Sequence, residues 1–409
     1  MSNLPKGWEE VLVENVFDNI GGTSLEKFVN ENGKYKFISI GNYSKSGKYI
    51  DNSQRIDINE KSANKILNKN DLVMVLNDKT STGDIIGSSI LIEESDKYIY
   101  NQRSERLICK NNIYPKFAWQ LLNSKYFRKK IVSLSQGGTQ IYINFPVIKK
   151  INFYLPPLEE QKKIADILST VDKKIAFVEE NINATEELKK GLMQKLLTEG
   201  IGHTEFKDSE LGRLPESWEI DKLENLTTKI GDGLHGTPKY VEQSDYYFIN
   251  GNNLNGESIE INKNTKCVNE EEYIKNKKIL DNTTILLSIN GTVGSLAYYN
   301  NENVMLGKSV AYMNVNSKIL KQFLFYLLKS SKILEYFILE LTGTTIKNLS
   351  LKTIRNTRIP LPQLEEQKQI AEILLIVDKK LESLKEKKQS FEELKKGLMQ
   401  KLLTGEVRV

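Results

Sequence analysis

One helical segment occurs twice in this chain, at a constant separation of 206 residues. Residues 156–198 read PPLEEQKKIADILSTVDKKIAFVEENINATEELKKGLMQKLLT, and residues 362–404 read PQLEEQKQIAEILLIVDKKLESLKEKKQSFEELKKGLMQKLLT. This period is far longer than the roughly 20 to 50 residues of a solenoid repeat. The repeated unit is therefore a whole domain followed by a helix, and we expect approximate internal two-fold symmetry.

Each copy of the segment is predicted to form one long helix. Apolar residues recur at alternating steps of four and three, which is the heptad pattern of a coiled-coil seam. Because both copies carry the seam and a domain separates them, we expect them to pair with each other as an antiparallel coiled coil. The seam residues are Ile164, Leu168, Val171, Ile175, Val178, Ile182 and Thr185 in the first copy, and Ile370, Leu374, Val377, Leu381, Leu384, Lys388 and Phe391 in the second.

Three residues depart from the helical pattern. Lys388 stands where the first copy has Ile182. We expect its ammonium to reach solvent from the helix edge, with a role in fixing the register or contacting a partner as the alternative. Gly191 and Gly397 each cost a helix about 1 kcal/mol relative to alanine. Their presence in both copies suggests a bend, or the close approach of another helix or subunit.

The rest of the chain is predicted to form two α+β domains. A chain of 409 residues exceeds the roughly 250 to 300 residues of a single hydrophobic core. Each region outside the helices contains a short apolar run that is predicted to form a buried strand (residues 71–75 and 283–287), followed by a glycine turn and then by a helix near its end. We place the first globular domain at 1–155, the first spacer helix at 156–198, a linker at 199–213, the second globular domain at 214–361 and the second spacer helix at 362–409.

Composition argues against several kinds of chemistry. Cys109 and Cys267 lie far apart in the sequence, which argues against a disulfide framework or a cysteine zinc site. His203 and His235 are the only histidines, which argues against a histidine-based metal site or catalytic triad. There is no phosphate-binding loop, no dinucleotide-binding glycine motif and no apolar stretch long enough for a membrane span. We expect a soluble cytoplasmic protein with no catalysis, metal or cofactor of its own.

Residues 1–155 carry most of the +5 net charge, which suits an anionic partner such as DNA.

The motifs together carry a family resemblance. A Leu-Pro-x-x-Trp sequence opens both globular domains, Leu-Glu-Glu-Gln-Lys opens both helices, and Leu-Lys-Lys-Gly-Leu-Met-Gln-Lys-Leu-Leu-Thr closes both. In this order, from end to end, the chain resembles the specificity subunits of type I restriction-modification systems. The resemblance implies two target recognition domains, each reading one half of a bipartite double-stranded DNA sequence. The two helices would set the spacing of the halves.

The resemblance also implies partners and their cofactors. Two methyltransferase subunits, which hold S-adenosylmethionine, would dock on the helices. A restriction subunit using ATP and magnesium would join through the methyltransferase core. The helix residues expected to contact the methyltransferase subunits are Leu158, Gln161, Ile164, Leu192 and Met193 in the first copy, and Leu364, Gln367, Ile370, Leu398 and Met399 in the second.

Polar loops at corresponding places in the two domains are the candidate DNA contacts, because base edges are read by Arg, Lys, Asn, Gln, Ser and Thr. The alternative for each residue is a phosphate contact or a solvated loop position. For the loop at 231–238 (GDGLHGTP), the alternative to DNA contact is a tight structural turn. At the corresponding place the first domain has only the sequence IGGTS, at 20–24. The candidates are Lys79, Thr80, Thr82, Thr139, Gln140, Tyr142 and Asn144 in the first domain, and Asp232, His235, Thr237, Lys239, Asn290, Thr292, Thr344, Thr345, Lys347 and Asn348 in the second.

Two other classes of protein remain as alternatives. One is the recognition part of a fused type II restriction-methylation enzyme, which the missing catalytic motifs disfavour. The other is a non-enzymatic coiled-coil DNA-binding protein; a purely structural coiled-coil dimeriser is disfavoured by the two dissimilar loop-bearing domains.

Overall fold

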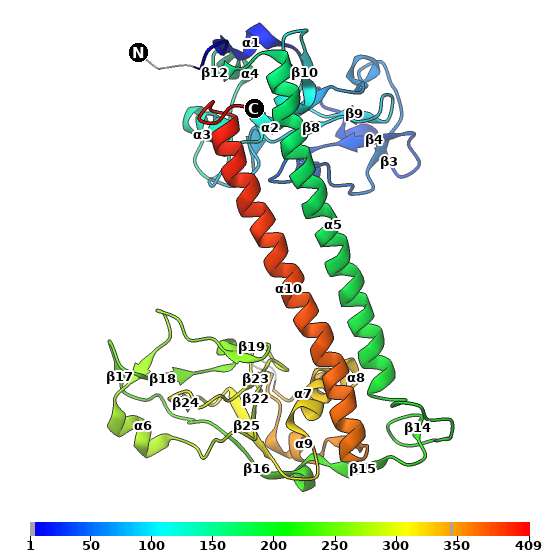
Figure 1. Cartoon of the computed structure of the whole chain (residues 1–409), viewed down its shortest axis with the longest axis vertical. Helices are drawn as coiled ribbons and strands as arrows, with labels where there is room; N and C mark the ends of the chain where they lie inside the picture. The colour runs from blue at the N-terminus through cyan, green and yellow to red at the C-terminus, as the bar shows by residue number, and fades with distance from the viewer. Residues whose placement is uncertain (1–4, 344–346) are drawn as a thin grey trace. The chain divides into compact units, whose positions relative to one another are not determined.

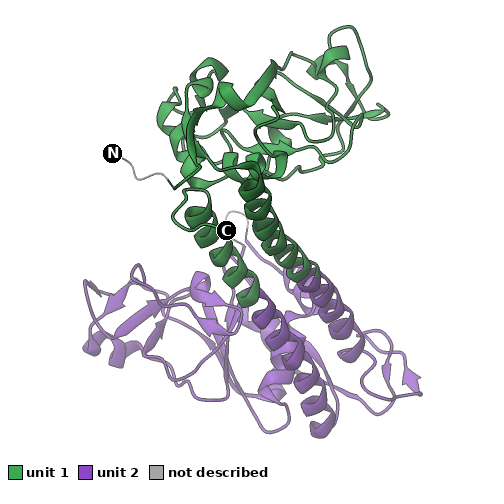
Figure 2. Ribbon diagram, turned by 45° about the horizontal axis from the view of Figure 1, so that its top comes forward, with its two compact units in different colours: residues 1–180, 386–409 green, residues 181–385 purple. Residues whose placement is uncertain are grey.

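The chain forms two compact units. The computed structural model describes residues 5–343 and 347–409, coloured along the chain in Figure 1. Unit 1 comprises residues 1–180 and 386–409, and unit 2 comprises residues 181–385 (Figure 2). Each unit therefore contains one globular domain and a part of each long helix.

The globular part of unit 1 is built from small sheets covered by short helices. An antiparallel sheet has the strand order β2-β10-β6-β8, and a mixed sheet has the order β3-β5-β4-β9, in which β4 and β9 are parallel. Strands β1 and β12 form one further pair, and β7 and β11 another. The elements are β1 (Glu9–Leu12), α1 (Val13–Val16), β2 (Phe17–Gly21), η1 (Glu26–Phe28), β3 (Val29–Asn30), β4 (Tyr35–Ile38), η2 (Ile40–Asn42), β5 (Arg55–Ile56), η3 (Ala63–Lys65), β6 (Leu72–Val75), β7 (Asn77–Asp78), β8 (Ser89–Leu91), β9 (Tyr98–Tyr100), β10 (Ser104–Cys109), α2 (Pro115–Leu122), α3 (Lys125–Leu134), β11 (Ile141–Tyr142), α4 (Phe145–Lys149) and β12 (Asn152–Leu155).

Unit 2 repeats this topology. Its antiparallel sheet has the order β16-β25-β22-β23, its mixed sheet has the order β17-β21-β18-β24 with β18 and β24 parallel, and β15 pairs with β26. Two short hairpins, β13-β14 and β19-β20, are additional. The elements are β13 (Phe206–Lys207), β14 (Leu214–Pro215), β15 (Glu219–Lys222), η4 (Leu223–Leu226), β16 (Thr227–Asp232), β17 (Tyr240–Val241), β18 (Tyr246–Ile249), η5 (Gly251–Asn253), β19 (Leu254–Asn255), β20 (Ser258–Ile259), β21 (Cys267–Val268), α6 (Glu270–Asn276), β22 (Thr284–Ser288), β23 (Leu296–Tyr298), β24 (Val304–Leu306), β25 (Val310–Val315), α7 (Lys321–Lys329), α8 (Ser331–Leu339), α9 (Leu351–Asn356) and β26 (Arg358–Leu361).

An inner strand of each antiparallel sheet is buried on both faces. Every residue of β6 is buried, and successive side chains point to opposite faces of a strand. Leu72 and Met74 join the core that also contains helices α2 and α3, while Val73 and Val75 join a separate core with the mixed sheet. An uninterrupted apolar run therefore marks a strand between two cores, as the sequence predicts for this segment.

The long helices α5 (Leu158–Leu196) and α10 (Leu364–Leu402) pair in an antiparallel manner. In unit 1, Asp172 contacts Lys395 at 2.7 Å and Glu179 contacts Lys388 at 2.9 Å. Residue numbers thus rise along one helix while they fall along the other. The predicted coiled coil is confirmed, and its apolar seam is buried from Ile164 to Ile182 and from Ile370 to Leu384.

The three departures from the helical pattern have different outcomes. The Lys388 ammonium pairs with Glu179 of the other helix (2.9 Å) at a partly exposed position on the helix edge, so the expected reach to the surface and the alternative role in the register both fit the structure. A Cβ added to Gly191 or Gly397 would meet no described atom within 4 Å. The close approach suggested for these glycines therefore does not come from the described part of the chain.

A cluster that we call the aspartate clasp occurs once in each unit. In unit 1, Asp172 on α5 accepts hydrogen bonds from Lys395 on α10 (2.7 Å) and from Gln120 Nε2 on α2 (2.8 Å). In unit 2, Asp378 on α10 accepts from Lys189 on α5 and from the Tyr326 hydroxyl on α7 (2.9 Å). Each clasp joins both helices to the neighbouring domain.

A second cluster, the glutamate clasp, lies at the start of each helix. Glu160 accepts from the Trp8 indole nitrogen (3.1 Å) and from Arg408 (2.8 Å). The Arg408 hydrogen bond lowers the pKa of Glu160. Glu366 accepts likewise from the Trp218 indole nitrogen (3.0 Å) and lies 2.8 Å from His203 Nε2. The Leu-Pro-x-x-Trp motif thus anchors each domain to the helix that follows it.

Breaking one aspartate clasp should destabilise the chain measurably. The Lys395→Met substitution leaves the partly buried Asp172 carboxylate, whose side chain is 18% exposed, with only Gln120 as a partner. We expect a loss of about 2 kcal/mol, because an underpaired, largely buried charge loses solvation without compensation. Urea unfolding of the full chain measures this loss.

The matched control for this experiment is Lys385→Met. Lys385 also pairs across the helices, with Glu186, but the two side chains are 59% and 50% exposed. Exposed pairs contribute little, so we expect a change of less than about 0.5 kcal/mol. Equal losses in the two variants would contradict the importance assigned to the clasp.

Candidate nucleic-acid interface

Two candidate segments of unit 1 lie side by side. Strand β7 pairs with β11, which places Asp78 opposite Ile141 and Asn77 opposite Tyr142. The loop that follows β7 therefore lies beside the segment that contains β11, although about 60 residues separate them in the sequence. All the candidate side chains of this domain are exposed: Lys79, Thr80, Thr82, Thr139, Gln140, Tyr142 and Asn144.

Asp78, which the sequence did not single out, orders the loop after β7. Its carboxylate accepts hydrogen bonds from the Thr80 nitrogen (2.9 Å), the Thr80 hydroxyl (2.8 Å) and the Ile85 nitrogen (2.7 Å). Burial raises the pKa of Asp78, but these hydrogen bonds outweigh burial and leave it lowered. The Thr80 and Thr82 hydroxyls also contact each other at 2.9 Å. An ionised aspartate thus gives the loop a defined conformation.

The corresponding segments of unit 2 also meet. Asn290 forms a β-bridge with Asn348, which is bridged in turn to Thr342. This arrangement matches unit 1, where Tyr142 bridges to Gln136. Asn290 and Asn348 are therefore brought together, with the exposed residues Thr292 and Lys347 beside them. The candidates Thr344 and Thr345 lie outside the described residues.

The glycine loop of unit 2 packs tightly but presents polar side chains. A Cβ on Gly233 would lie 2.2 Å from the Leu306 carbonyl oxygen, and Leu234 forms a β-bridge with Gly307. His235 Nε2 lies 2.7 Å from Asp232 Oδ2, and His235 is mostly exposed. The candidates Thr237 and Lys239 are exposed too. The loop is thus a tight turn in its backbone and a polar surface in its side chains.

Residues 20–24 take the same place in unit 1. A Cβ on Gly22 would lie 1.9 Å from the Asn101 carbonyl oxygen, and the Gly22 nitrogen donates to the Ser104 carbonyl oxygen (2.9 Å). In unit 2 the Gly233 nitrogen donates in the same way to the Val310 carbonyl oxygen (3.1 Å). Unit 1 has the turn but no counterpart of the Asp232 and His235 pair.

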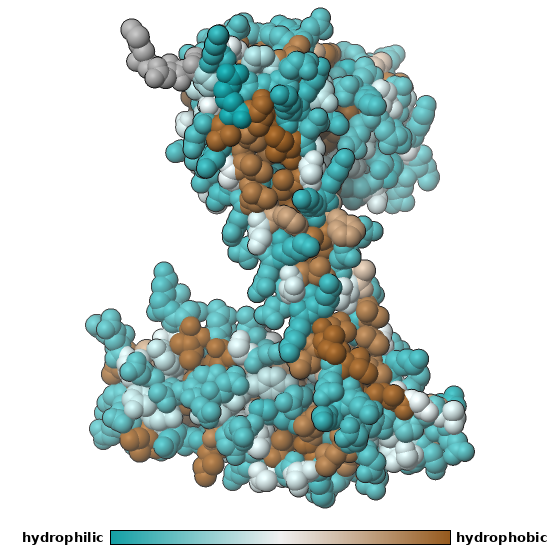
Figure 3. All heavy atoms as spheres, viewed as in Figure 1, coloured by the Kyte–Doolittle hydropathy of each residue, from teal (hydrophilic) through white to brown (hydrophobic). Residues whose placement is uncertain are grey.

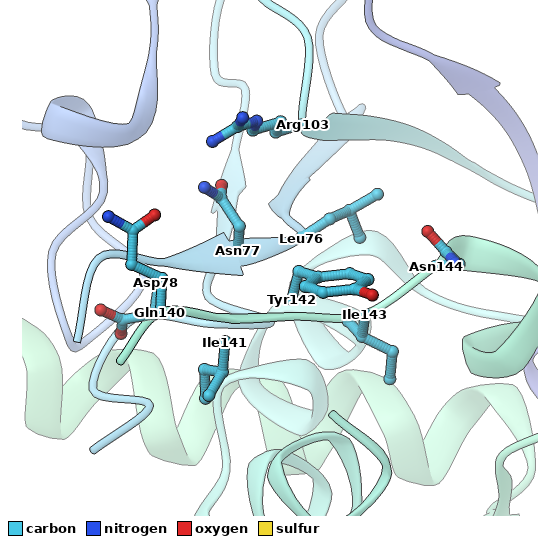
Figure 4. A pocket seen from close by; sticks show the side chains of 9 residues that line it. All are labelled: Leu76, Asn77, Asp78, Arg103, Gln140, Ile141, Tyr142, Ile143 and Asn144. Atoms are coloured by element: carbon cyan, nitrogen blue, oxygen red, sulfur yellow. The ribbon is translucent and has the colours of Figure 1, made fainter. Parts of the chain in front are cut away.

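A cavity of about 370 Å³ lies between β7, β11 and the turn from β9 to β10. Its lining includes three candidates, Gln140, Tyr142 and Asn144 (Figure 4). Three polar residues that the sequence did not single out, Asn77, Asp78 and Arg103, line it as well. Their signal in the sequence was weak, since Asn77 ends an apolar run and Arg103 lies in an unremarkable polar turn.

The residues expected to contact methyltransferase subunits fall into three groups. Gln161, Ile164, Gln367 and Ile370 are fully buried in the chain's own cores. Leu158 and Leu364 are exposed. Partly buried against the cores lie Leu192, Met193, Leu398 and Met399.

The two buried glutamines tie each domain to its helix. Gln161 accepts from the Tyr114 nitrogen (2.7 Å) and donates to the Pro156 carbonyl oxygen (2.8 Å). Gln367 accepts from the Leu320 nitrogen (2.7 Å) and donates to the Pro362 carbonyl oxygen (2.9 Å). Such fully satisfied amides hold the start of the helix against the domain.

The described residues offer neither a membrane-spanning helix nor a metal-binding cluster. None of the helices within residues 5–343 and 347–409 is both long and apolar enough to cross a membrane. In the same residues, no group of three or more His, Cys, Asp and Glu side chains is arranged to hold a metal ion.

Comparisons with known proteins agree over almost the whole chain. The model of the type I restriction modification DNA specificity domain matches residues 5–187 and again residues 215–393. The MjaVIII type I restriction enzyme specificity subunit of Methanocaldococcus jannaschii is 31% identical over 422 residues, which cover 99% of this chain and 94% of that protein.

Solved structures share the fold. The S subunit of a type I restriction-modification system from M. genitalium has a TM-score of 0.60 at 18% identity, covering 98% of this chain and 97% of that one. A chain from a structural study of complex assembly and conformational transition in the type I R-M system has a TM-score of 0.62 at 17% identity, covering 100% of both chains. With the family model matched twice, this chain belongs to the type I restriction-modification DNA specificity subunits.

Proposed function

We propose that this chain supplies DNA specificity to a type I restriction-modification complex, with each globular domain reading one half of a bipartite, asymmetric site. The observation that carries the proposal is that the two globular domains share one fold but differ in their exposed side chains. The two domains have the same strand order, yet Tyr142 in unit 1 corresponds to Asn348 in unit 2, and only unit 2 has the Asp232 and His235 pair. Different side chains at equivalent positions read different base sequences.

The long helices would set the number of unread base pairs between the halves. Helices α5 and α10 have 39 residues each, which gives a length of about 58 Å at about 1.5 Å per residue. One turn of duplex DNA is about 34 to 36 Å. A helix of about 58 Å is therefore long enough to hold two DNA-reading domains over separate segments of the groove. The spacing would follow the number of helical residues.

Exposed leucines on the helices support the docking of two methyltransferase subunits. Leu188 on α5 is 55% exposed and Leu394 on α10 is 49% exposed, and they occupy equivalent positions of the repeat. Gly191 and Gly397 lie one turn further on, with open space in front of them, so another backbone can approach closely there. Hydrophobic surface, brown in Figure 3, gathers along the paired helices where α10 ends in unit 1.

The division of chemistry follows from this docking. Methylation would use S-adenosylmethionine on the methyltransferase subunits, and the restriction subunit, with its ATP and magnesium, would join through the methyltransferase core. The chain itself would recognise DNA without catalysing a reaction. Leu158 and Leu364, exposed at the helix starts, would extend the docking surface. The buried residues would support that surface from the core without touching the partner: Gln161, Ile164, Gln367 and Ile370.

Methylation-sensitive sequencing of the host genome tests the recognition proposal. We expect one bipartite motif with adenine methylation in each half, and we expect that motif to lose methylation when the gene for this chain is deleted. The two halves should differ in sequence, because the two domains differ at equivalent positions. A palindromic motif without an unread gap, or no loss on deletion, would contradict the proposal.

Native mass spectrometry of the chain with its methyltransferase subunit tests the docking proposal. The Leu188→Lys and Leu394→Lys substitutions should each reduce the stoichiometry from two methyltransferase subunits to one, and the double variant should bind none. A charge placed in the centre of an apolar contact must be desolvated without a partner. Both leucines are exposed in the free chain, so its folding should not change.

The control for the docking experiment is Ile279→Lys. Ile279 is even more exposed, at 83%, but it lies in the segment between α6 and β22 of the globular domain and not on a long helix. This variant should keep two methyltransferase subunits. Retention of two subunits by the double leucine variant would place docking elsewhere.

A further inference from the structure

Arg103 is the one arginine of unit 1 without an acceptor among the described residues. Its guanidinium is exposed at the turn between β9 and β10. The other four arginines of the unit are engaged: Arg55 with Asp51, Arg106 with Asp71, Arg128 with the Asp84 carbonyl oxygen and Arg408 with Glu160. The structure thus leaves one guanidinium free to bind something outside the chain.

The backbone holds Arg103 in an unfavourable conformation. Its φ angle is 61°, in the left-handed region that favours glycine. The turn is fixed on both sides, because the Arg103 carbonyl oxygen accepts from the Leu76 nitrogen (2.8 Å) and Asn101 Oδ1 accepts from the Leu25 nitrogen (3.0 Å). Strain of this kind persists where the surroundings enforce it, and it is concentrated at functional sites.

Asn77, which lines the same cavity, has an unpaired amide oxygen. The residue is only 7% exposed, and its Oδ1 is buried without a hydrogen-bond partner among the described residues. Buried side-chain amides in folded proteins are almost always hydrogen-bonded. An unpaired amide oxygen on a residue that lines a cavity therefore points to a partner that arrives from outside.

The cavity places these groups together. Figure 4 shows the side chains of Asn77 and Arg103 on the same side of the β7–β11 pair, while Ile141 points the other way. Ile141 is buried in the core. The Tyr142 ring and the exposed Gln140 and Asn144 side chains complete the polar rim.

We propose that this cavity is the base-reading site for the first half-site, with Arg103 contacting a guanine. The proposal rests on the proposed function and deepens it. A guanidinium fork matches the O6 and N7 acceptors of guanine in the major groove, and an asparagine amide can both donate to and accept from a neighbouring base edge. The Tyr142 ring supplies apolar contact next to them.

Unit 2 lacks this cation at the equivalent position. The Leu76 nitrogen donates to the Arg103 carbonyl oxygen, and the Ile289 nitrogen donates likewise to the Ser309 carbonyl oxygen (2.9 Å), so Ser309 corresponds to Arg103. The Ser309 hydroxyl is already engaged, because it donates to Asn250 Oδ1 (3.0 Å) and accepts from the Gly251 nitrogen (2.9 Å). The guanine contact therefore belongs to the first half-site alone.

Base-resolved binding of the chain in complex with its methyltransferase subunit tests the proposal. The probes are duplexes that carry the motif found by methylation mapping, and a set in which each base pair of both halves is replaced singly. The Arg103→Gly substitution suits the backbone, since glycine adopts a φ of 61° without strain, so the variant should melt no lower than the parent. We expect about tenfold to hundredfold weaker binding to the intact motif.

The pattern of loss matters more than its size. The Arg103→Gly variant should become indifferent to one guanine position of the first half, while every substitution in the second half keeps its effect. The Arg103→Lys variant retains the charge but not the fork, and it should recover overall affinity better than discrimination at that guanine. Asn77→Leu should keep or raise the melting temperature and yet weaken discrimination at an adjacent base pair.

Lys116→Gln is the control for charge. Lys116 is an exposed residue of α2 that does not line the cavity, and its loss should leave the pattern of base preferences unchanged.

If the Arg103→Gly variant bound all probes more weakly by the same factor, Arg103 would be a phosphate contact and the proposal would be overturned. Unchanged binding would overturn it too. A lower melting temperature of Asn77→Leu with intact discrimination would overturn the role of Asn77. Failure of the proposed function is distinct, because no bipartite motif would then be found at all.

Discussion

The aspartate clasp is the interaction on which the rest of the structure depends. A carboxylate in the middle of each long helix, 18% exposed, is satisfied by a lysine of the other helix and by one side chain of the neighbouring domain. A slip of the helices by even one residue would remove the lysine and leave a largely buried charge unpaired. Each clasp therefore fixes both the register of the two helices and the position of the neighbouring domain on them.

Such an anchor explains how the domains could diverge while the helices stayed alike. The domain contributes to each clasp through one side chain, Gln120 in unit 1 and Tyr326 in unit 2, which differ in chemistry but both donate a hydrogen bond. Together with Trp8 and Trp218 in the glutamate clasps, these few contacts hold the frame. Loops that take no part in these contacts, such as the turn with Arg103 or Ser309, can change without breaking them.

The sequence predicted what depends on local periodicity. The heptad seam, the antiparallel helix pairing and the buried strand at Leu72–Val75 follow from spacing and apolar runs, and all are present. The polar loops were found because glycine turns mark them. The family resemblance placed Gln161 among the partner contacts, and the structure shows its side chain buried and hydrogen-bonded to Tyr114 and Pro156. Arg103 and Asn77 were missed because their importance is tertiary: only folding shows that Arg106 is paired with Asp71 while Arg103 is left free.

Under the proposed function, the long helices carry two independent DNA-reading domains at a distance set by helix length. Insertion of seven residues into each helix, after Glu180 in α5 and after Lys385 in α10, preserves the heptad seam and adds about 10 Å. Methylation mapping of a host that carries this variant should show the same two half-sites separated by about three more unread base pairs. An unchanged gap, or altered half-site sequences with the old gap, would contradict the account.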